Sequence, residues 1–221
     1  MIATSLINWV KRQNPKFAYL HAAFGHKPFI LLDIGAGNQS ATKTLRLFPN
    51  CSYHGLDLSR DYNNQESDFS LMKAFYELDL TQLQFDEIPK DHFDSILIVH
   101  VIEHLYNGDL VQAALLPKLK KGGTMYVEYP CKRSTKLPSM RGTLNYHDDS
   151  THVRLYSIEE LKGLFETAGC TVKASGYRRS WFYVLATPFR IVLRWARGKA
   201  VTGNIFWDLL GFAEYVIVKK N

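Results

Sequence analysis

Short apolar segments of strand length alternate along the chain with segments whose apolar residues recur at helical spacing. Most of the short segments are apolar almost throughout, which is typical of strands buried on both faces of a sheet. Because strand–helix–strand crossovers are right-handed, repeated units of this kind bring successive strands back parallel to one another. The pattern therefore predicts an α/β fold with a doubly wound, mostly parallel seven-stranded sheet and helices on both faces. The predicted strands are 29–34, 52–58, 75–80, 93–99, 124–129, 171–174 and 213–219.

The two ends of the chain depart from this alternation. Residues 1–28 are predicted to form an N-terminal helical element, with helices at 4–13 and 16–24 separated by an Asn-Pro pair. The last strand follows Gly211 too closely for another crossover helix, so we expect it to run antiparallel or to lie at an edge of the sheet.

Two connections stand out by length or composition. Residues 130–156 make a long connection after the fifth strand, either a flexible insert or the floor of a substrate site. Residues 180–211, rich in aromatic side chains and arginine, are expected to form a helical insertion before the last strand. The Thr-Pro pair at 187–188 is predicted to open a helix that Gly198 closes. No repeat or Gly/Ser linker interrupts the chain, so we expect a single domain over 1–221.

The net charge of +6 is unevenly distributed. Residues 1–128 carry a net charge of −2, whereas residues 129–221 carry +8. A basic C-terminal part favours an acidic partner there, such as an anionic small molecule, a lipid surface or nucleic acid. A solvated basic face that keeps the protein in solution is an equal alternative.

Composition also excludes several classes of protein. The three cysteines are widely spaced and form neither a disulfide framework nor paired metal-ligand spacing, which favours a reducing compartment. The first residues contain no uninterrupted apolar run for a signal peptide, and no window reaches the roughly 18 to 20 apolar residues that cross a bilayer. We therefore expect a cytoplasmic protein, with peripheral contact at the inner membrane face left open.

A buried strand that ends in an acid and two glycines is the first sign of a ligand site. Asp33 precedes Gly35 and Gly37, and glycines there let the backbone turn tightly against a ligand before a helix begins at Ser40. Asp57 ends the next strand, where a carboxylate can accept both hydroxyls of a ribose. Turn and acid together indicate an adenosine-type cofactor.

The details of the turn disfavour a dinucleotide. A dinucleotide turn requires a third glycine where Ser40 stands. The carboxylate of Asp33 would repel a pyrophosphate, and it suits a cation such as the amino group of a methionine moiety. A nicotinamide oxidoreductase is therefore the weaker hypothesis.

Six ordered motifs between about residue 29 and residue 170 resemble class I S-adenosylmethionine-dependent methyltransferases related to the ubiquinone-biosynthesis O-methyltransferases. They are Leu-Asp-Ile-Gly-Ala-Gly-Asn (32–38), Gly-Leu-Asp-Leu-Ser (55–59), Phe-Asp-Ser-Ile (93–96), His-Val-Ile-Glu-His-Leu (100–105), Leu-Lys-Lys-Gly-Gly-Thr (119–124) and Thr-His-Val-Arg-Leu-Tyr-Ser (151–157). The resemblance implies a Rossmann-like fold, S-adenosylmethionine as cofactor and methyl transfer as the reaction. The chain departs from the family at Gln39, where a third glycine is frequent.

The resemblance also implies roles for individual residues. Asp33, Gly35 and Gly37 would surround the methionine part of the cofactor. The other implied contacts are Asp57 with the ribose, Leu58 with the adenine ring, Asp79 with the adenine amino group and His100 with the sulfonium.

His100, Glu103 and His104 form a pattern that can be mistaken for a metal site. Two histidines four residues apart can bind a metal from one helix face, but no glutamate follows the first histidine as it does in zinc proteases. We therefore expect no metal here and favour hydrogen bonding at a helix start for Glu103 and His104.

The long connection 130–156 also contains candidates for proton transfer. A histidine oriented by a carboxylate can deprotonate a hydroxyl group during methyl transfer. His152 is the first candidate for this base and His147 the second, with Asp148 and Asp149 close by in the sequence. The alternative for His152 is a structural role, in which its ring bridges two loops.

The helix predicted within 180–211 is basic and amphipathic. Arg190, Arg194 and Arg197 fall on one face, and large apolar side chains cover much of the rest. Such a helix can dock on anionic lipid or hold a long anionic substrate. Cover for a sheet edge and a contact in a homodimer are the alternatives.

These observations predict transfer of a methyl group to an oxygen of a small anionic, sugar-containing or lipid-linked acceptor. RNA methylation is one alternative; the basic C-terminal part is compatible with it, but we recognise no RNA-binding module in the sequence. A non-catalytic methyltransferase-like binding subunit is another, and the intact cofactor residues argue against it.

Overall fold

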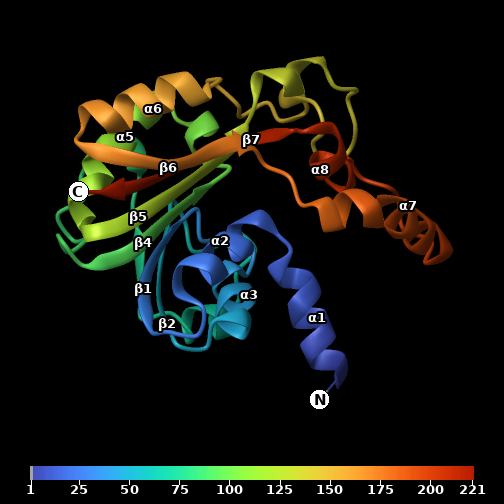
Figure 1. The fold of residues 1–221 in the computed structure, drawn as a ribbon, viewed down its shortest axis with the longest axis horizontal. Coiled ribbons are helices and arrows are strands. Elements are labelled where there is room, and N and C mark those ends of the chain that lie inside the picture. Colours follow the sequence, from blue (N-terminus) through green and yellow to red (C-terminus); the bar gives the residue numbers. More distant parts are fainter. Residues whose placement is uncertain (1) are drawn as a thin grey trace.

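A computed structural model describes residues 2–221, with side chains from Leu6 onward. Its centre is one seven-stranded sheet in the order β3-β2-β1-β4-β5-β7-β6 (Figure 1). All strands run parallel except β7, which is antiparallel to both of its neighbours. The strands are β1 (Phe29–Ile34), β2 (Cys51–Asp57), β3 (Ala74–Glu77), β4 (Phe93–Val99), β5 (Leu119–Pro130), β6 (Cys170–Tyr177) and β7 (Ala213–Lys220).

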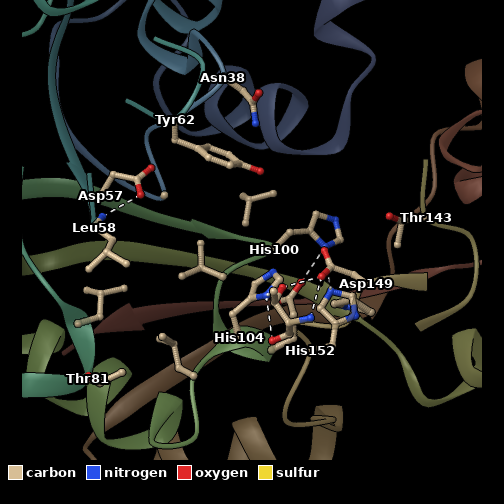
Figure 2. A pocket seen from close by; sticks show the side chains of 18 of the residues that line it. Asn38, Asp57, Leu58, Tyr62, Thr81, His100, His104, Thr143, Asp149 and His152 are labelled. Carbon is tan, nitrogen blue, oxygen red and sulfur yellow. Dashed lines mark hydrogen bonds and ion pairs between the residues drawn. The ribbon is translucent and has the colours of Figure 1, made fainter. Parts of the chain in front are cut away.

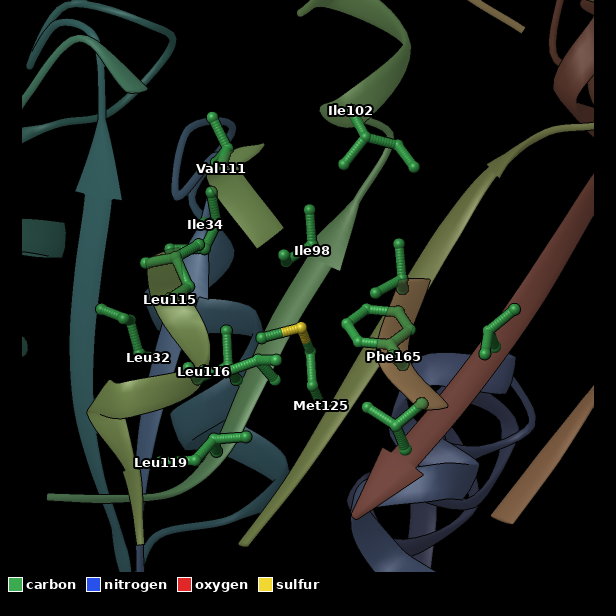
Figure 3. Packing of buried hydrophobic residues seen from close by; sticks show 14 of the residues in the cluster. Leu32, Ile34, Ile98, Ile102, Val111, Leu115, Leu116, Leu119, Met125 and Phe165 are labelled. Carbon is green, nitrogen blue, oxygen red and sulfur yellow. The ribbon is translucent and has the colours of Figure 1, made fainter. Parts of the chain in front are cut away.

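Helices cover both faces of the sheet, as predicted. On one face, Leu20 of α2 and Leu47 of α3 pack against the buried strands. On the other face, Leu115 of α5 and Phe165 of α6 complete a second apolar cluster (Figure 3). None of the helices described in residues 2–221 has the length and apolar character that crossing a membrane requires. The α-helices are α1 (Ile2–Arg12), α2 (Pro15–Phe24), α3 (Ser40–Leu47), α4 (Glu66–Phe69), α5 (Gly108–Leu115), α6 (Ile158–Thr167), α7 (Trp181–Ala196) and α8 (Trp207–Leu210), and the short 3-10 turns at the site are η1 (Leu80–Gln82), η2 (Ile102–His104), η4 (Lys132–Lys136) and η5 (Tyr146–Asp148).

The α/β fold is confirmed, with one strand longer than the sequence predicts. Strand β5 begins at Leu119 rather than at 124, although the Gly122-Gly123 pair is typical of a turn. The strand passes through the glycines with a register irregularity against β4. A side chain at Gly123 would come within 3.0 Å of the Phe93 carbonyl, so the glycine permits the close approach of the two strands.

The last strand is antiparallel, as predicted, but it lies inside the sheet. β7 pairs with β5 on one side and with β6 on the other, so β6 forms the edge.

The helix predicted to open at 187–188 begins seven residues earlier. Helix α7 starts at Trp181, where the Ser180 side chain caps it, and Pro188 lies in its interior. Proline inside a helix lacks the N–H that would bond the carbonyl four residues earlier, and the helix continues past Pro188 without it; the neighbouring Thr187 hydroxyl donates to the Tyr183 carbonyl at 2.7 Å. A Thr-Pro pair is therefore compatible with a helix interior as well as with a helix start.

The long connection 130–156 is a built structure. The carboxylate of Asp148 accepts hydrogen bonds from the backbone N–H groups of Met140, Leu144 and Asn145, at 2.8 to 3.0 Å. Burial raises the pKa of Asp148, but these hydrogen bonds and the one from Ser139 hold it well below its ordinary value. At the end of this connection Ser157 caps α6, because its Oγ accepts from the Glu160 N–H.

Candidate active site

A cavity of about 590 Å³ opens at the carboxyl ends of β1, β2, β4 and β5. This is the edge at which open α/β sheets bind their ligands. Asp57 and Leu58 lie on one side of the cavity, and His100, His104 and His152 gather on the other (Figure 2).

The glycines of the first turn have different tasks. Gly35 lines the cavity with φ at +76°, and its N–H donates to the Leu56 carbonyl at 2.8 Å. A side chain at Gly35 would approach Val101 Cγ2 to 2.6 Å. Gly37 lies outside the lining and faces Tyr62, whose ring carbon Cδ1 is 2.3 Å from the position of a missing Cβ. The first glycine keeps the turn open toward the cavity, and the second makes room for Tyr62.

Asp33 lies beneath this turn and outside the cavity lining. Its carboxylate is buried and accepts hydrogen bonds from Ser40 Oγ at 2.6 Å and from the Tyr53 hydroxyl at 2.7 Å. Ser40 is the first residue of α3, so Asp33 fixes the helix start against the sheet. The structure gives Asp33 this supporting role, and its contact with the methionine amino group stays a prediction.

Asp57 ends β2 and lines the cavity beside Leu58. Its Oδ1 accepts the Leu58 N–H at 2.8 Å, and burial raises the pKa of the carboxyl group. Because Tyr53, the partner of Asp33, lies four residues before Asp57 in the same strand, the two carboxylates project from the same face of the sheet. Leu58 is 67% exposed and offers an apolar surface next to the acid.

Asp79 also lines the cavity, but its carboxylate already accepts hydrogen bonds from a neighbouring residue. It caps η1 by accepting the Thr81 hydroxyl at 2.7 Å and the Thr81 N–H at 2.9 Å. These hydrogen bonds lower the pKa of Asp79. The carboxylate is thereby held in one orientation at the rim, and its contact with an adenine amino group stays a prediction.

His100 follows β4 with a positive φ of 55° and stands between two acids. Its Nδ1 is 3.2 Å from Glu103 Oε1, and its Nε2 is 3.2 Å from Glu128 Oε1. Burial lowers the pKa of His100, but hydrogen bonding to Glu103 and Glu128 raises it to about 9. Both ring nitrogens therefore carry a proton at neutral pH, and the imidazole is positively charged. It packs against Trp207, with ring centroids 4.8 Å apart.

Glu128 connects His100 to a buried ion network. Glu128 Oε1 is 3.3 Å from Arg178 Nε, and Arg178 Nη1 donates to Asp208 in α8. These three side chains are all buried. Burial raises the pKa of Glu128, but Arg178 and His100 lower it to about 2. The network joins the ends of β4, β5 and β6 to the insertion.

His152 and His104 stand side by side, with ring centroids 4.8 Å apart. The Nδ1 of His152 lies 2.6 Å from the Tyr146 carbonyl, which can only accept a hydrogen bond. Nδ1 therefore carries the proton and Nε2 has a free lone pair when the ring is neutral. The orienting group is thus a backbone carbonyl, whereas the sequence suggested a carboxylate; Asp149 Oδ2 is 4.0 Å from His152 Nε2.

The predicted site residues divide into two groups. Gly35, Asp57, Leu58, Asp79, His100 and His152 line the cavity. Asp33 and Gly37 support the first turn from outside the lining, and the second candidate base, His147, is exposed in η5.

Several functional side chains carry no signal in the sequence. Tyr62 reaches the cavity from the connection between β2 and α4, and Trp207 and Phe212 reach it from the end of the insertion. Arg178 and Asp208 pair across 30 residues. The composition of the insertion was a general clue, but these contacts arise from tertiary packing, which periodicity and motif spacing do not report.

Comparison with known proteins places this geometry in a family. The chain matches the family model described as a methyltransferase domain over residues 9–175. A search of curated proteins finds no match.

Solved structures share the fold at low sequence identity. A SAM-dependent methyltransferase from Archaeoglobus fulgidus is 19% identical with a TM-score of 0.58, over 98% of this chain and 94% of that one. The 1,6-didemethyltoxoflavin N1-methyltransferase of Burkholderia thailandensis, solved with S-adenosylhomocysteine, is 16% identical with a TM-score of 0.60, over 95% and 78%. Phosphoethanolamine N-methyltransferase 2 of Haemonchus contortus, solved with S-adenosylmethionine, is 18% identical with a TM-score of 0.64, over 94% and 52%.

The residues of the cavity fit S-adenosylmethionine. Gly35 leaves space at the turn, Asp57 offers a carboxylate that accepts the N–H of its own neighbour Leu58, and Leu58 exposes an apolar face beside it. These are the features that a methionine chain, a ribose and an adenine require in that order. With the family match over most of its length, the chain belongs to the methyltransferase-domain family and is a class I S-adenosylmethionine-dependent methyltransferase of Rossmann-like fold.

Proposed function

We propose that this enzyme transfers the methyl group to a hydroxyl oxygen of a small anionic acceptor that is sugar-containing or lipid-linked. The observation that carries the proposal is the free Nε2 of His152 in the cavity lining, across from Asp57. S-adenosylmethionine supplies the methyl group. Asp57, Leu58 and Asp79 hold its adenosine part, with Asp33, Gly35 and Gly37 shaping the turn for its methionine part. His100 stands beside the sulfonium.

Positioning accounts for most of the rate in this proposal. Holding the oxygen in line with the methyl group is worth on the order of 7 to 11 kcal/mol. A base adds roughly 10² to 10⁴-fold. His152 is a better candidate for this base than His100, because the pKa of His100, about 9, keeps its ring protonated at neutral pH. His147 is exposed outside the cavity lining and is the weaker candidate.

An anionic acceptor is supported by the charge of the connection 130–156. Lys132, Arg133, Lys136 and Arg141 are all exposed on it. The two acids of this connection, Asp148 and Asp149, offset only part of that charge, so the connection has a net positive charge. The same connection contributes Thr143 and His152 to the cavity lining, so a positively charged segment forms part of the site, which favours an anionic acceptor.

A lipid-linked acceptor is supported by helix α7, whose apolar side faces solvent. Arg190 lies on the opposite side, where its guanidinium stacks over the Tyr183 ring at 5.0 Å, and Thr187 is buried there. The apolar stripe is defined by Trp181 (68% exposed), Leu185 (80%), Phe189 (67%), Val192 (59%) and Trp195 (79%). A stripe of this size on an exposed helix marks a surface that is covered by something else.

We propose that an anionic lipid surface binds this stripe, because of the charges in the segments around it. Trp9 of α1 packs edge-on against Phe182 at 5.2 Å, so the C-terminal part of α1 contacts the start of α7. No aspartate or glutamate occurs before Asp33 or between Glu166 and Asp208, whereas lysine and arginine occur in both segments. The segments that contain the stripe and its contact on α1 thus carry basic side chains and no acid, which favours an anionic membrane surface.

Labelled cofactor tests the proposal directly. Purified enzyme is incubated with methyl-labelled S-adenosylmethionine and either membrane lipids, soluble small molecules or RNA from cells. We expect label in an anionic, organic-soluble product that survives mild alkali, as a methyl ether does. Label in nuclease-sensitive material, or label released by alkali as from a methyl ester, would contradict it. The Asp57→Ala enzyme serves as the inactive control.

A further inference from the structure

Three side chains with free lone pairs meet at the side of the cavity where the methyl acceptor is proposed to bind. Glu103, His104 and His152 each offer one atom that can bind a metal ion, and these atoms lie within 4.8 Å of one another. Glu103 and His104 belong to η2, whereas His152 follows η5. The sequence draws attention to His100 and His104, but the fold pairs His104 with His152 instead.

The proton of His104 is held on the far side of its ring. His104 Nδ1 is 2.8 Å from Thr151 Oγ1, and that hydroxyl donates its one hydrogen to Asp149 Oδ1 at 2.6 Å. The hydroxyl must therefore accept from His104, so Nδ1 is protonated and Nε2 keeps its lone pair. His152 is arranged in the same way by the Tyr146 carbonyl. In each ring, Nδ1–H is therefore hydrogen-bonded to an oxygen and Nε2 is free, as in a histidine that binds a metal through Nε2.

Glu103 completes the cluster with a buried carboxylate that is only half used. The residue is 1% exposed, and its Oε1 binds His100. Its Oε2 is buried without a hydrogen-bond partner. A buried carboxylate oxygen without a donor is unfavourable, and a cation beside it removes the penalty.

We propose that Glu103, His104 and His152 bind one divalent first-row transition-metal cation. Two imidazoles and one carboxylate are a ligand set typical of such ions, whereas Mg²⁺ prefers oxygen ligands. Metal–nitrogen distances of about 2.1 Å place ligand atoms about 3.3 Å apart in a tetrahedral site. Small side-chain rotations, above all of the partly exposed His104, bring the three atoms to that spacing.

This inference rests on the proposed function for what the cation does, and it refines the part given to His152. Three protein ligands leave coordination positions open toward the cavity. An acceptor hydroxyl bound at an open position loses its proton more readily, because the cation stabilises the oxyanion. In the loaded protein His152 would hold the cation instead of acting as the base, and the proton of the acceptor hydroxyl would pass to water or to the carboxylate of Asp149, which lines the cavity.

Metal titration tests the site without any activity measurement. The full chain is stripped with chelator and titrated with Zn²⁺ by calorimetry and with Co²⁺ by visible absorption. We expect one cation per chain and Co²⁺ bands typical of nitrogen and oxygen ligands. His104→Gln and Glu103→Gln should each weaken Zn²⁺ binding at least tenfold. His147→Gln, an exposed histidine on the same connection, should leave it unchanged.

The outcomes separate the cation site from the enzyme assignment. His104 is partly exposed, so its variant should fold, and circular dichroism checks this for each protein. Zn²⁺ binding that is absent, or equal in wild type and both variants, overturns the cation site. S-adenosylhomocysteine binding is measured on the same metal-free samples. Retained binding of that compound with no Zn²⁺ site would sink only this inference, and loss of it in wild type would sink the proposed function.

Discussion

Asp57 is a residue at which cofactor binding can be separated from folding. Its carboxylate makes one short hydrogen bond, to the neighbouring Leu58 N–H. Two hydrogen bonds from ribose hydroxyls to a carboxylate are worth about 1.5 to 3 kcal/mol each. We expect Asp57→Ala to weaken S-adenosylhomocysteine binding about 100-fold or more by calorimetry and to leave the melting temperature nearly unchanged. Asp61→Ala, at an exposed acid nearby, is the control.

His54 predicts a pH dependence of stability. Burial, together with His92 and Lys73, lowers the pKa of His54 to about 4, and its ring also faces Tyr76. In the unfolded chain the pKa is about 6.5, so between these values only the unfolded state takes up the proton. Stability is fully present above pH 6.5 and falls as the pH drops, by about 2 kcal/mol at pH 5. Urea unfolding of wild type and His54→Phe at pH 7 and pH 5 checks this. An equal loss in both proteins would exclude His54 as its source.

Single residues were predictable where backbone geometry constrains the side chain. Gly35 and Asp57 follow from a strand, a turn and a spacing, and all three are visible in the sequence. The supporting role of Asp33 was not predictable, because its hydrogen-bond partner Tyr53 lies in the next strand. The local sequence pattern gives no information about such contacts between strands. The convergence of His104 with His152 depends on how a long connection folds back, and no motif encodes it.

At the scale of elements, helix α7 shows how one sequence pattern is compatible with two structures. Its amphipathic character was predictable, but neither its start nor the direction of its apolar side was. The start moved because Ser180 is as good a cap as Thr187. The direction is set by Tyr183 and Arg190, which pack inward.

The apolar stripe of α7 makes a prediction about membranes. Sedimentation with vesicles should show binding to phosphatidylglycerol vesicles and much weaker binding to phosphatidylcholine vesicles. The double substitution Leu185→Glu and Phe189→Glu should reduce the bound fraction at least tenfold, because it places charge in the apolar contact. Leu71→Glu, at an exposed leucine away from α7, is the matched control. A stable dimer by ultracentrifugation that the double variant disrupts, without vesicle binding, would assign the stripe to a second copy.

At the scale of the whole molecule, the network of Glu128, Arg178 and Asp208 ties the sheet to the insertion. Arg178→Met leaves the buried carboxylate of Asp208 without its cation and removes one of the two cations beside Glu128, which costs about 3 to 5 kcal/mol. Urea unfolding should show this loss, and Arg179→Met, at the exposed neighbour, should change stability by less than about 0.5 kcal/mol. An equal effect of both substitutions would mean that the network does not stabilise the fold.

The overall topology was predictable because each parallel strand–helix unit has a short-range signature and a fixed handedness. The position of the last strand was harder to predict, because β7 lies between β5 and β6, two strands that precede it in the sequence. Hydrophobic pattern identifies a strand, but it does not distinguish an edge from the interior of a sheet.

The position of β7 has a consequence for synthesis on the ribosome. Among residues 2–221, β6 pairs with no strand other than β7, and one side of β5 stays unpaired until β7 is added. While residues 213–220 have not yet left the ribosome, the nascent chain therefore has an unpaired strand edge beside the forming cofactor pocket. Other chains can pair with that edge. Translation that stalls in the insertion would therefore leave a protein with unpaired strand edges, which is prone to aggregate.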